Sequence, residues 1–379
     1  MTDRYQLECG LCNRSFSLEM PTWKCRCPVC DAPLRFPMAA VSLETLSGLP
    51  GIGRYAEALP IEPDCAMTEG LTPMRKATGE WGGARSGLHF KVETGNTTGS
   101  FKDRGSALVV SAARVFGARR IAVASTGNAA VSLATYAPKF GFRLDIVVPS
   151  FCDESKLSRM RGDGVSVHRV SGGYSAAEAF CRRLCHHDWY PGGSDNPYRL
   201  EGTKTIAFEM IDQLPHLSIE RVMVPVGTGN LLAAVRKGFM ELMRAGIIAK
   251  CPKLDAVQLD VVAPLNKQVM ENAAYPPAKS AAGGINVPSA VQKLAALEAV
   301  RKTGGRIHRV TDDAVLRATA LLAAQEGIAA EPTGAVCFAA YLSGLESGAI
   351  HSEENTVVMV TGGATIPVGQ ARLRSVTER

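Results

Sequence analysis

From about residue 88 onward, short runs of β-branched residues alternate with longer stretches in which apolar residues recur every three or four positions. The short runs predict strands at 88–93, 120–124, 143–148, 165–170, 221–226, 256–262, 306–310 and 356–361. The longer stretches predict helices at about 101–116, 127–140, 173–187, 201–214, 230–246, 289–303, 312–326 and 332–345. This alternation predicts an α/β protein whose parallel sheets are covered by helices on both faces.

Composition narrows the class of protein and of partner. The 379 residues are 46% apolar and 21% charged, which excludes disordered, collagen-like and coiled-coil proteins and leaves room for two or three domains. The net charge of +6 is small and scattered, so we expect a small-molecule ligand, with no nucleic acid and no membrane as partner. The first residues carry no basic segment followed by an apolar stretch, so we expect a cytoplasmic protein with mostly reduced cysteines.

Residues 1–36 hold five of the eleven cysteines and leave little room for a core. Cys9 and Cys12 form one CxxC pair, and Cys27 and Cys30 form a second after a fourteen-residue spacer. Four thiolates at this spacing suit tetrahedral Zn²⁺, and a site closed by four sulfur ligands stabilises a fold rather than performing catalysis. Cys25 in place of Cys27, free thiols and a disulfide are the alternatives.

The segment 90–105, FKVETGNTTGSFKDRG, ends a strand in a polar loop and begins a helix. Ser100 is a good N-cap, with Asp103 three residues further on, so we expect the helix to begin there. Lys102 then lies in the first turn, where the positive end of the helix dipole disfavours its ammonium form. A lysine with a lowered pKa can act as a Schiff-base amine or a general base, whereas the alternative is a solvated lysine in a capped helix.

Three predicted strands run into turns that offer backbone N–H groups or hydroxyls to a ligand. The turn STGN (125–128) opens a helix at residue 129 and suits a carboxylate. The turn GTGN (227–230) precedes another helix and suits a phosphate, and TGG (361–363) lies at the carboxyl edge of a sheet, where ligands bind in α/β folds. Each turn taken alone also fits a plain strand-to-helix connection.

Five segments resemble the threonine synthases: GSFKDRG (99–105), STGNAA (125–130), PYRLEGTKTIAFEM (197–210), PVGTGN (225–230) and TGG (361–363). More broadly they resemble the fold-type II pyridoxal-phosphate enzymes, which include serine/threonine dehydratases and cysteine synthases. The resemblance covers about residues 40–370 and implies two open, twisted, mostly parallel sheets with flanking helices. It also implies a homodimer with a zinc ribbon at 1–36, a large pyridoxal-phosphate-binding domain at 37–98 and 190–379, and a smaller α/β domain at 99–189.

The resemblance further implies roles for individual residues. Lys102 resembles the lysine that holds pyridoxal phosphate covalently and moves the substrate Cα proton. Asn128 would hydrogen-bond the cofactor's 3′-oxygen, and Thr361 would face the pyridine nitrogen, where a neutral hydroxyl leaves the ring a milder electron sink. The residues implied to bind the cofactor phosphate are Gly227, Thr228, Gly229, Asn230 and Leu231. Those implied to bind the carboxylate of the amino-acid substrate are Ser125, Thr126 and Gly127.

The implied reaction converts O-phosphohomoserine and water to threonine and phosphate. Ser194, Asn196 and Arg199 would then bind the leaving phosphate, with Arg199 preceding a helix that starts near Glu201. The alternative for Arg199 is a structural ion pair with Glu201 or Asp195.

Departures from the threonine synthase pattern leave a second reaction open. Gly193 stands where that family tends to have asparagine, the phosphate loop continues as Leu231-Leu232, and 280–289 lacks an arginine. These features resemble β-eliminating or β-replacing lyases, such as a serine/threonine dehydratase or a phosphoserine-using synthase. A non-catalytic zinc-ribbon protein that binds nucleic acid is a third alternative, and the intact Lys102 motif and the lack of a basic aromatic stripe argue against it.

Overall fold

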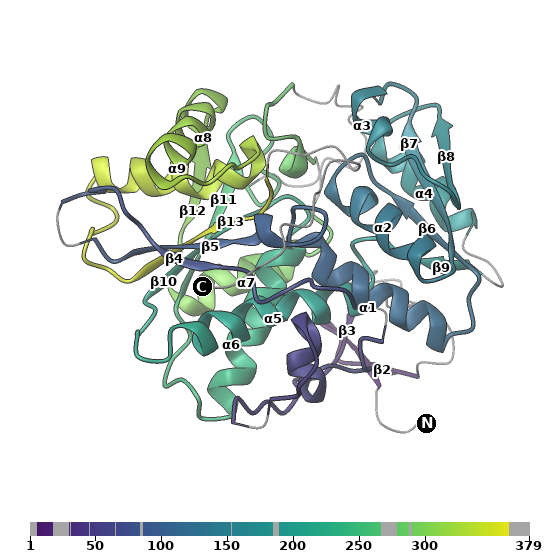
Figure 1. Cartoon of the computed structure of the whole chain (residues 1–379), viewed down its shortest axis with the longest axis horizontal. Helices are drawn as coiled ribbons and strands as arrows, with labels where there is room; N and C mark the ends of the chain where they lie inside the picture. Colours follow the sequence, from purple (N-terminus) through teal and green to yellow (C-terminus); the bar gives the residue numbers. More distant parts are fainter. Residues whose placement is uncertain are drawn as a thin grey trace, which may run out of the picture.

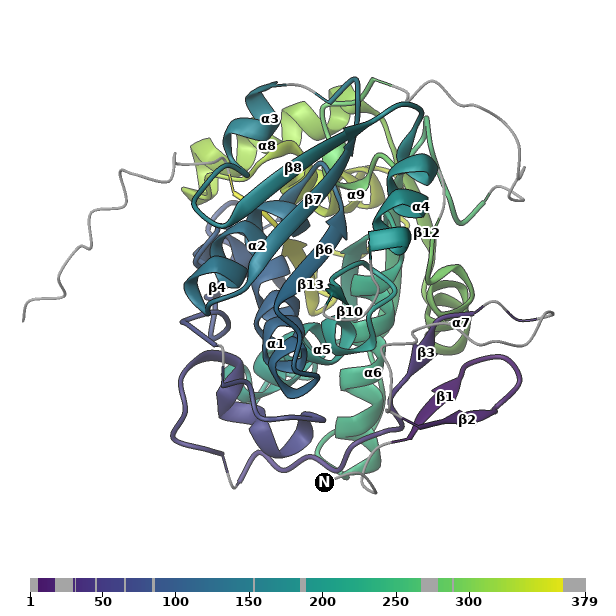
Figure 2. The ribbon, with the colours of Figure 1, turned by 90° about the vertical axis from the view of Figure 1, so that its right-hand side faces the viewer.

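The computed structural model describes residues 6–17, 30, 32–44, 46–64, 66–83, 86–152, 154–184, 189–266, 279–287 and 290–363. These residues form three sheets with helices packed around them (Figures 1 and 2). In Figure 1 the largest sheet lies on the left and a smaller parallel sheet on the right. Within the described ranges, no helix is long and apolar enough to cross a membrane.

The large sheet has the strand order β12-β11-β10-β13-β5-β4. Its strands are β4 Met74–Lys76, β5 Leu88–Val92, β10 Arg221–Pro225, β11 Lys253–Leu259, β12 Ile307–Val310 and β13 Thr356–Val360. Neighbours pair in parallel, except that β4 pairs antiparallel with β5 at the edge. The inner strands are almost fully buried, as expected where helices cover both faces of a sheet.

Alternate side chains of the large sheet enter two separate cores. The helices on one face are α5 Pro197–Gln213, α6 Asn230–Arg244 and α7 Lys293–Thr303, and those on the other are α8 Asp312–Glu326 and α9 Pro332–Glu346 (Figure 1). Val222 and Val224 of β10 pack with the first group, whereas Met223 between them packs with the second. Because both faces are covered, the strands read as continuous apolar runs in the sequence.

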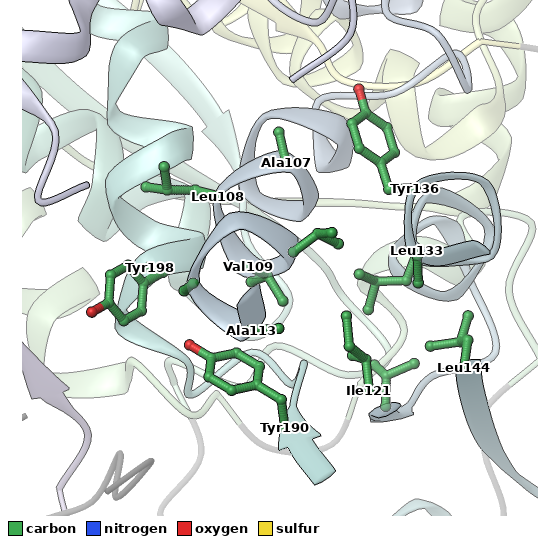
Figure 3. Close-up of a cluster of buried hydrophobic side chains, with 14 of the residues drawn as sticks. Ala107, Leu108, Val109, Ala113, Ile121, Leu133, Tyr136, Leu144, Tyr190 and Tyr198 are labelled. Carbon is green, nitrogen blue, oxygen red and sulfur yellow. The ribbon is translucent and has the colours of Figure 1, made fainter. Parts of the chain in front are cut away.

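The smaller sheet has the order β8-β7-β6-β9, with every pair parallel. Its strands are β6 Arg120–Ala124, β7 Arg143–Pro149, β8 Val165–Val170 and β9 Trp189–Pro191, and its helices are α1 Lys102–Val115, α2 Asn128–Lys139, α3 Glu154–Ser158 and α4 Tyr174–Leu184. Ile121 and Leu144 face α1 and α2, as Figure 3 shows, while Ala122 and Val147 pack against α4. The two helical layers thus sandwich this sheet as well.

A third, antiparallel sheet lies at the N-terminal end, with the order β2-β1-β3. Its strands are β1 Leu7–Cys9, β2 Ser15–Phe16 and β3 Leu34–Arg35. Leu7, Leu34 and Phe36 belong to the same buried cluster as α1, and the ring of Phe36 lies 4.9 Å from that of Tyr198 in α5. Figure 2 shows β3 beside α6. The segment therefore shares a core with α1 and α5.

The alternation of strands and helices predicted from sequence is confirmed, with most boundaries within two or three residues. The start of α5 was predicted near residue 201 but lies at Pro197, because Asn196 caps the helix and proline occupies its first position. The short elements β4, β9 and α3 were not predicted, nor were the 3-10 helices η1 Gly51–Ala58, η2 Glu93–Gly95 and η3 Gly283–Ile285. These short elements lack the apolar β-branched run or the helical periodicity on which the prediction depends, as the sequences MRK of β4 and ESKLS of α3 show.

Candidate active site

Lys102 is the first residue of α1, and the loop before it differs from the prediction. Ser100 was expected to cap the helix, but it forms an isolated β-bridge with Gly362, so its backbone is tied to the end of β13 instead. Phe101 is the residue at the cap position, without a side-chain hydrogen bond. The loop is held by Thr98, whose backbone N and hydroxyl donate to the Asp103 carboxylate at 2.6 and 2.5 Å.

The Lys102 ammonium group has a low-polarity environment. Its Nζ lies 4.5 Å from the centroid of the Phe101 ring, and no hydrogen bond or ion pair to another described residue balances its charge. The pKa of Lys102 is lowered to about 7, mainly by loss of solvent and then by the positive charge of Arg199, while Glu331 opposes the shift. The direction agrees with the sequence prediction, but burial rather than the helix dipole is the main cause.

A buried ion network fixes the start of α1. Arg104 donates to Glu93 at 2.7 Å through Nε and to Glu209 at 2.5 Å through Nη1, and all three side chains are fully buried. Lys91 of β5 donates to the same Glu209 at 2.8 Å. A buried guanidinium is tolerated only where carboxylates surround it, so this network clamps α1 against β5 and α5. It thereby sets the position of Lys102, two residues earlier in the helix.

Thr361 lies beside the lysine loop at the end of β13. Its carbonyl accepts a hydrogen bond from Phe101 N at 3.1 Å, and Gly363 N donates to Gly99 O at 2.9 Å. Thr361 itself is buried. Two segments more than 250 residues apart in sequence are therefore joined by main-chain bonds.

The turn STGN connects β6 to α2, which begins at Asn128, one residue earlier than predicted. The Asn128 amide donates to Glu331 Oε1 at 2.7 Å. A Cβ atom on Gly362 would lie 2.5 Å from that oxygen, so a side chain there would displace the Glu331 carboxylate. Glu331 was not identified from the sequence, and the Glu331-Pro332 pair that opens α9 is the feature that marks it. Burial raises the pKa of Glu331.

The turn GTGN connects β10 to α6, which begins at Asn230. Gly229 precedes it with φ of +83°, a left-handed conformation that favours glycine. A Cβ on Gly227 would lie 3.0 Å from Ile285 Cα, so this turn is closely packed. The Asn230 amide donates to Ser194 O at 3.1 Å, which ties the turn to the predicted substrate loop. The backbone N–H groups of the first turn of α6 remain suited to an anion.

Asn196 and Arg199 lie at the start of α5 and have different surroundings. Asn196 Oδ1 accepts from Tyr198 N at 2.9 Å and its amide donates to Pro191 O at 2.7 Å, so its side chain caps the helix. Arg199 is buried, and its Nη2 donates to Gly192 O at 2.9 Å. Its Nε has no hydrogen-bond partner among the described residues. Burial lowers the pKa of Arg199 to about 10, and the charge of Asp103 opposes that shift.

The structural role considered for Arg199 was an ion pair with Glu201 or Asp195, and the structure leaves only Asp195 as a candidate partner. The Glu201 carboxylate is bound to Lys204 at 2.6 Å and to Lys237, and therefore does not compensate Arg199. Asp195 remains as a neighbouring negative charge. Arg199 also packs tightly on α1, because a Cβ on Gly105 would lie 2.6 Å from Arg199 Cγ. The guanidinium is thus brought to the lysine-bearing helix rather than to the surface.

Three of the four predicted metal ligands lie together. The sulfur atoms of Cys9, Cys12 and Cys30 are all within 4.8 Å of one another. Cys27 and its alternative Cys25 lie outside the described residues.

Comparison with known proteins agrees with this arrangement. Residues 66–362 match the family model described as pyridoxal-phosphate dependent enzyme. The threonine synthase of Methanosarcina acetivorans is 34% identical over 370 residues, covering 94% of this chain and 91% of that protein. The threonine synthase of Methanocaldococcus jannaschii is 35% identical over 322 residues, covering 82% and 80% respectively.

Solved structures show the same fold at lower identity. Maize serine racemase has a TM-score of 0.65 at 22% identity, covering 79% of this chain and 89% of that chain. An L-serine ammonia-lyase from Rhizomucor miehei has a TM-score of 0.64 at 23% identity, covering 78% and 94%. These likenesses concern the fold of the sheets and helices and carry no information on substrate.

Proposed function

Because the chain belongs to the pyridoxal-phosphate-dependent enzymes, and among them to the threonine synthase family, we propose that it is a lyase that converts O-phosphohomoserine and water to threonine and phosphate. The relatives with this name match the chain over most of their own length. The remaining question is whether the chain's own residues fit the cofactor and a phosphorylated substrate.

Several features of the described residues fit pyridoxal phosphate. The lowered pKa of Lys102 provides the neutral amine that an aldehyde requires. The buried Ser100 hydroxyl beside it has no hydrogen-bond partner among the described residues. The closely packed turn 227–230 leads into a fifteen-residue helix whose first N–H groups suit the cofactor phosphate. We assign Lys102 to hold the cofactor, with Asn128 at its 3′-oxygen and Thr361 at its pyridine nitrogen.

The residues of the site then divide the chemical work. Bound pyridoxal phosphate supplies an electron sink that acidifies the substrate Cα–H. Lys102, neutral in much of the population near pH 7, would take the Cα proton, after which loss of a proton from Cβ would allow phosphate to leave from Cγ. Return of a proton to Cγ, addition of water at Cβ and return of a proton to Cα would then complete threonine. The turn 125–127 would bind the substrate carboxylate and so orient Cα toward the Lys102 amine. Thr361 would present an uncharged hydroxyl to the pyridine nitrogen.

The observation that carries the choice of a phosphate ester is the burial of Arg199. Its side chain is 2% exposed, its Nε is without a partner in the described part of the chain, and its charge influences Lys102. A buried guanidinium next to a lysine is costly unless an anion completes the site. The leaving phosphate of O-phosphohomoserine supplies that anion, and Ser194 lies against the phosphate-binding turn through the Asn230 amide.

The alternative function is β-elimination from serine or threonine. The substitution of Gly193 for the expected asparagine removes one possible phosphate donor and favours this reaction. A substrate without a second anion, however, would leave Arg199 with incomplete compensation. This balance favours the synthase.

The test is a substrate panel on the purified enzyme with its cofactor. O-phosphohomoserine, serine, threonine and phosphoserine are each incubated while inorganic phosphate, 2-oxoacid and ammonia are measured. We expect phosphate and threonine from O-phosphohomoserine at a kcat/KM at least about tenfold above that for the other three compounds. Oxoacid release from serine or threonine, with no phosphate released from O-phosphohomoserine, would replace the synthase by the alternative.

We also propose a structural zinc ion on Cys9, Cys12, Cys27 and Cys30. The closeness of three of these sulfurs supports it, because tetrahedral Zn²⁺ with Zn–S bonds of about 2.3 Å holds its ligands at such separations. A homodimer with domains at 1–36, at 37–98 with 190–379, and at 99–189 remains part of the proposal. Size-exclusion chromatography with light scattering tests the dimer.

A further inference from the structure

Two buried serines that have no part in the reaction so far lie between the lysine-bearing helix and Arg199. Ser106 belongs to α1 and Ser132 to α2, and both are fully buried. Their Oγ atoms are hydrogen-bonded at 2.7 Å. Ser106 Oγ also accepts a hydrogen bond from Arg199 Nη1, at 3.4 Å. On the other side, the Ser132 hydroxyl lowers the pKa of the Asp103 carboxyl, against the larger raising effect of burial.

These contacts form a continuous row from a cation to a carboxyl group. A guanidinium only donates and a carboxylate only accepts, whereas a hydroxyl can do both. Ser106 Oγ therefore accepts from both Arg199 Nη1 and the Ser132 hydroxyl, which joins the guanidinium to α2 through Ser106. The surrounding core is apolar, as the side chains of Ala107 and Leu133 in Figure 3 illustrate. A hydroxyl buried in such a core destabilises the folded protein unless it makes hydrogen bonds.

The row also fixes the plane of the guanidinium. Nη1 is held by Ser106 and Nη2 by the carbonyl of Gly192, while Nε has no partner among the described residues. The described residues therefore hold the two terminal nitrogens of the guanidinium and leave Nε without a partner. Ser111, the other buried serine of α1, differs because its hydroxyl donates to Ala107 O in its own helix.

We propose that Ser106 and Ser132 are positioning residues, which link Asp103 to Arg199 and so hold the guanidinium ready for the anionic group of the substrate. This inference rests on the proposed function, in which that anion is the leaving phosphate. Neither serine touches the substrate, so their effect is exerted through Arg199. They should influence how tightly the anion is bound rather than how fast the Cα proton moves.

The experiment uses the full-length enzyme with its cofactor and the variants Ser106→Ala and Ser132→Ala, with Ser111→Ala as the matched control. KM and kcat are measured on O-phosphohomoserine, and the Kd of inorganic phosphate is measured by titration calorimetry. For Ser106→Ala we expect about a tenfold rise in both KM and phosphate Kd, with kcat changed less than about threefold. Ser132→Ala should change the same quantities in the same direction by a smaller factor, and Ser111→Ala by less than about twofold.

The result can go against the proposal in three ways. Ser106→Ala with wild-type KM and phosphate Kd overturns the positioning role alone, provided that the wild type releases phosphate. An equal rise in Ser111→Ala overturns it as well, because the effect would then come from packing of α1. A wild type that neither releases nor binds phosphate overturns the proposed function and this role together. If Ser106→Ala does not fold, Ser132→Ala decides, since its wild-type phosphate Kd would equally remove the link from Asp103.

Discussion

The lowered pKa of Lys102 allows the rate at which the protein captures its cofactor to be predicted. With a pKa of about 7, about three quarters of the amine is neutral at pH 7.5, whereas an ordinary lysine with a pKa of about 10.4 is neutral in about one molecule per thousand. Only the neutral amine attacks an aldehyde. Apoprotein should therefore capture pyridoxal phosphate about 600-fold faster at pH 7.5 than an exposed lysine of equal reactivity.

The assay mixes cofactor-free protein with pyridoxal phosphate between pH 5.5 and 9.5 and follows the change in absorbance. The capture rate should rise with pH and level off above a midpoint near 7. Because the charge of Arg199 lowers the pKa of Lys102, Arg199→Met should move the midpoint to higher pH. Glu331→Gln should move it to lower pH by a smaller amount, since the Glu331 charge acts on Lys102 less strongly than that of Arg199.

Glu298→Gln is the matched control, because this carboxylate is 40% exposed and pairs with Arg236 on α6. It should leave the midpoint where the wild type has it. A wild-type midpoint above 9 would refute the reasoning, and so would a downward shift in Arg199→Met. Either result would mean that burial and the neighbouring guanidinium do not govern the amine.

Three further predictions concern other parts of the molecule. Arg199→Ala should lower kcat/KM on O-phosphohomoserine by about two to four orders of magnitude, with partial recovery in Arg199→Lys; steady-state kinetics showing an equal loss on unphosphorylated amino acids would argue against phosphate recognition. Cys9→Ser with Cys12→Ser should remove about one zinc per chain and lower the melting temperature while the cofactor spectrum of the folded protein is kept; metal analysis that finds no zinc in the wild type contradicts this. Glu209→Gln should lower the free energy of unfolding by about 3–5 kcal/mol, because Arg104 and Lys91 lose their shared buried carboxylate; a denaturant midpoint equal to that of the wild type would show that the network is not stabilising.

Much of the fold was predictable because its strands are buried on both faces. The predicted runs 120–124 and 221–226 match β6 and β10 to within one residue, and apolar β-branched runs of this kind have few other uses in a globular protein. The edge strand β4 was missed because its sequence, Met-Arg-Lys, carries two cations and is only partly buried. Pairing with β5 decides its structure, and such pairing is not visible locally.

Two helix starts were predicted wrongly from the sequence, for opposite reasons. Ser100 and Asp103 have the spacing of a cap, yet the β-bridge to Gly362 takes the Ser100 backbone out of the helix. Asn196 followed by Pro197 is a stronger start than the one predicted near residue 201, and the structure uses it. The first error could not be avoided from sequence, because Gly362 lies at the far end of the chain. The second could, because Asn at the cap with proline after it is a local pattern.

Both the sequence and the structure are needed to argue for a phosphate leaving group. Replacement of an expected asparagine by Gly193 removes a side chain from the predicted phosphate site, and Asn196 is occupied as a helix cap. In the proposed reaction, binding of the anion would then fall more heavily on Arg199, assisted by Ser194 and main-chain N–H groups. A site that depends on one guanidinium needs that group held in place before substrate arrives, since ordering it on binding would reduce affinity. The buried link through Ser106 is the feature of this chain that meets that need, and only the packing of α1 against α5 reveals it.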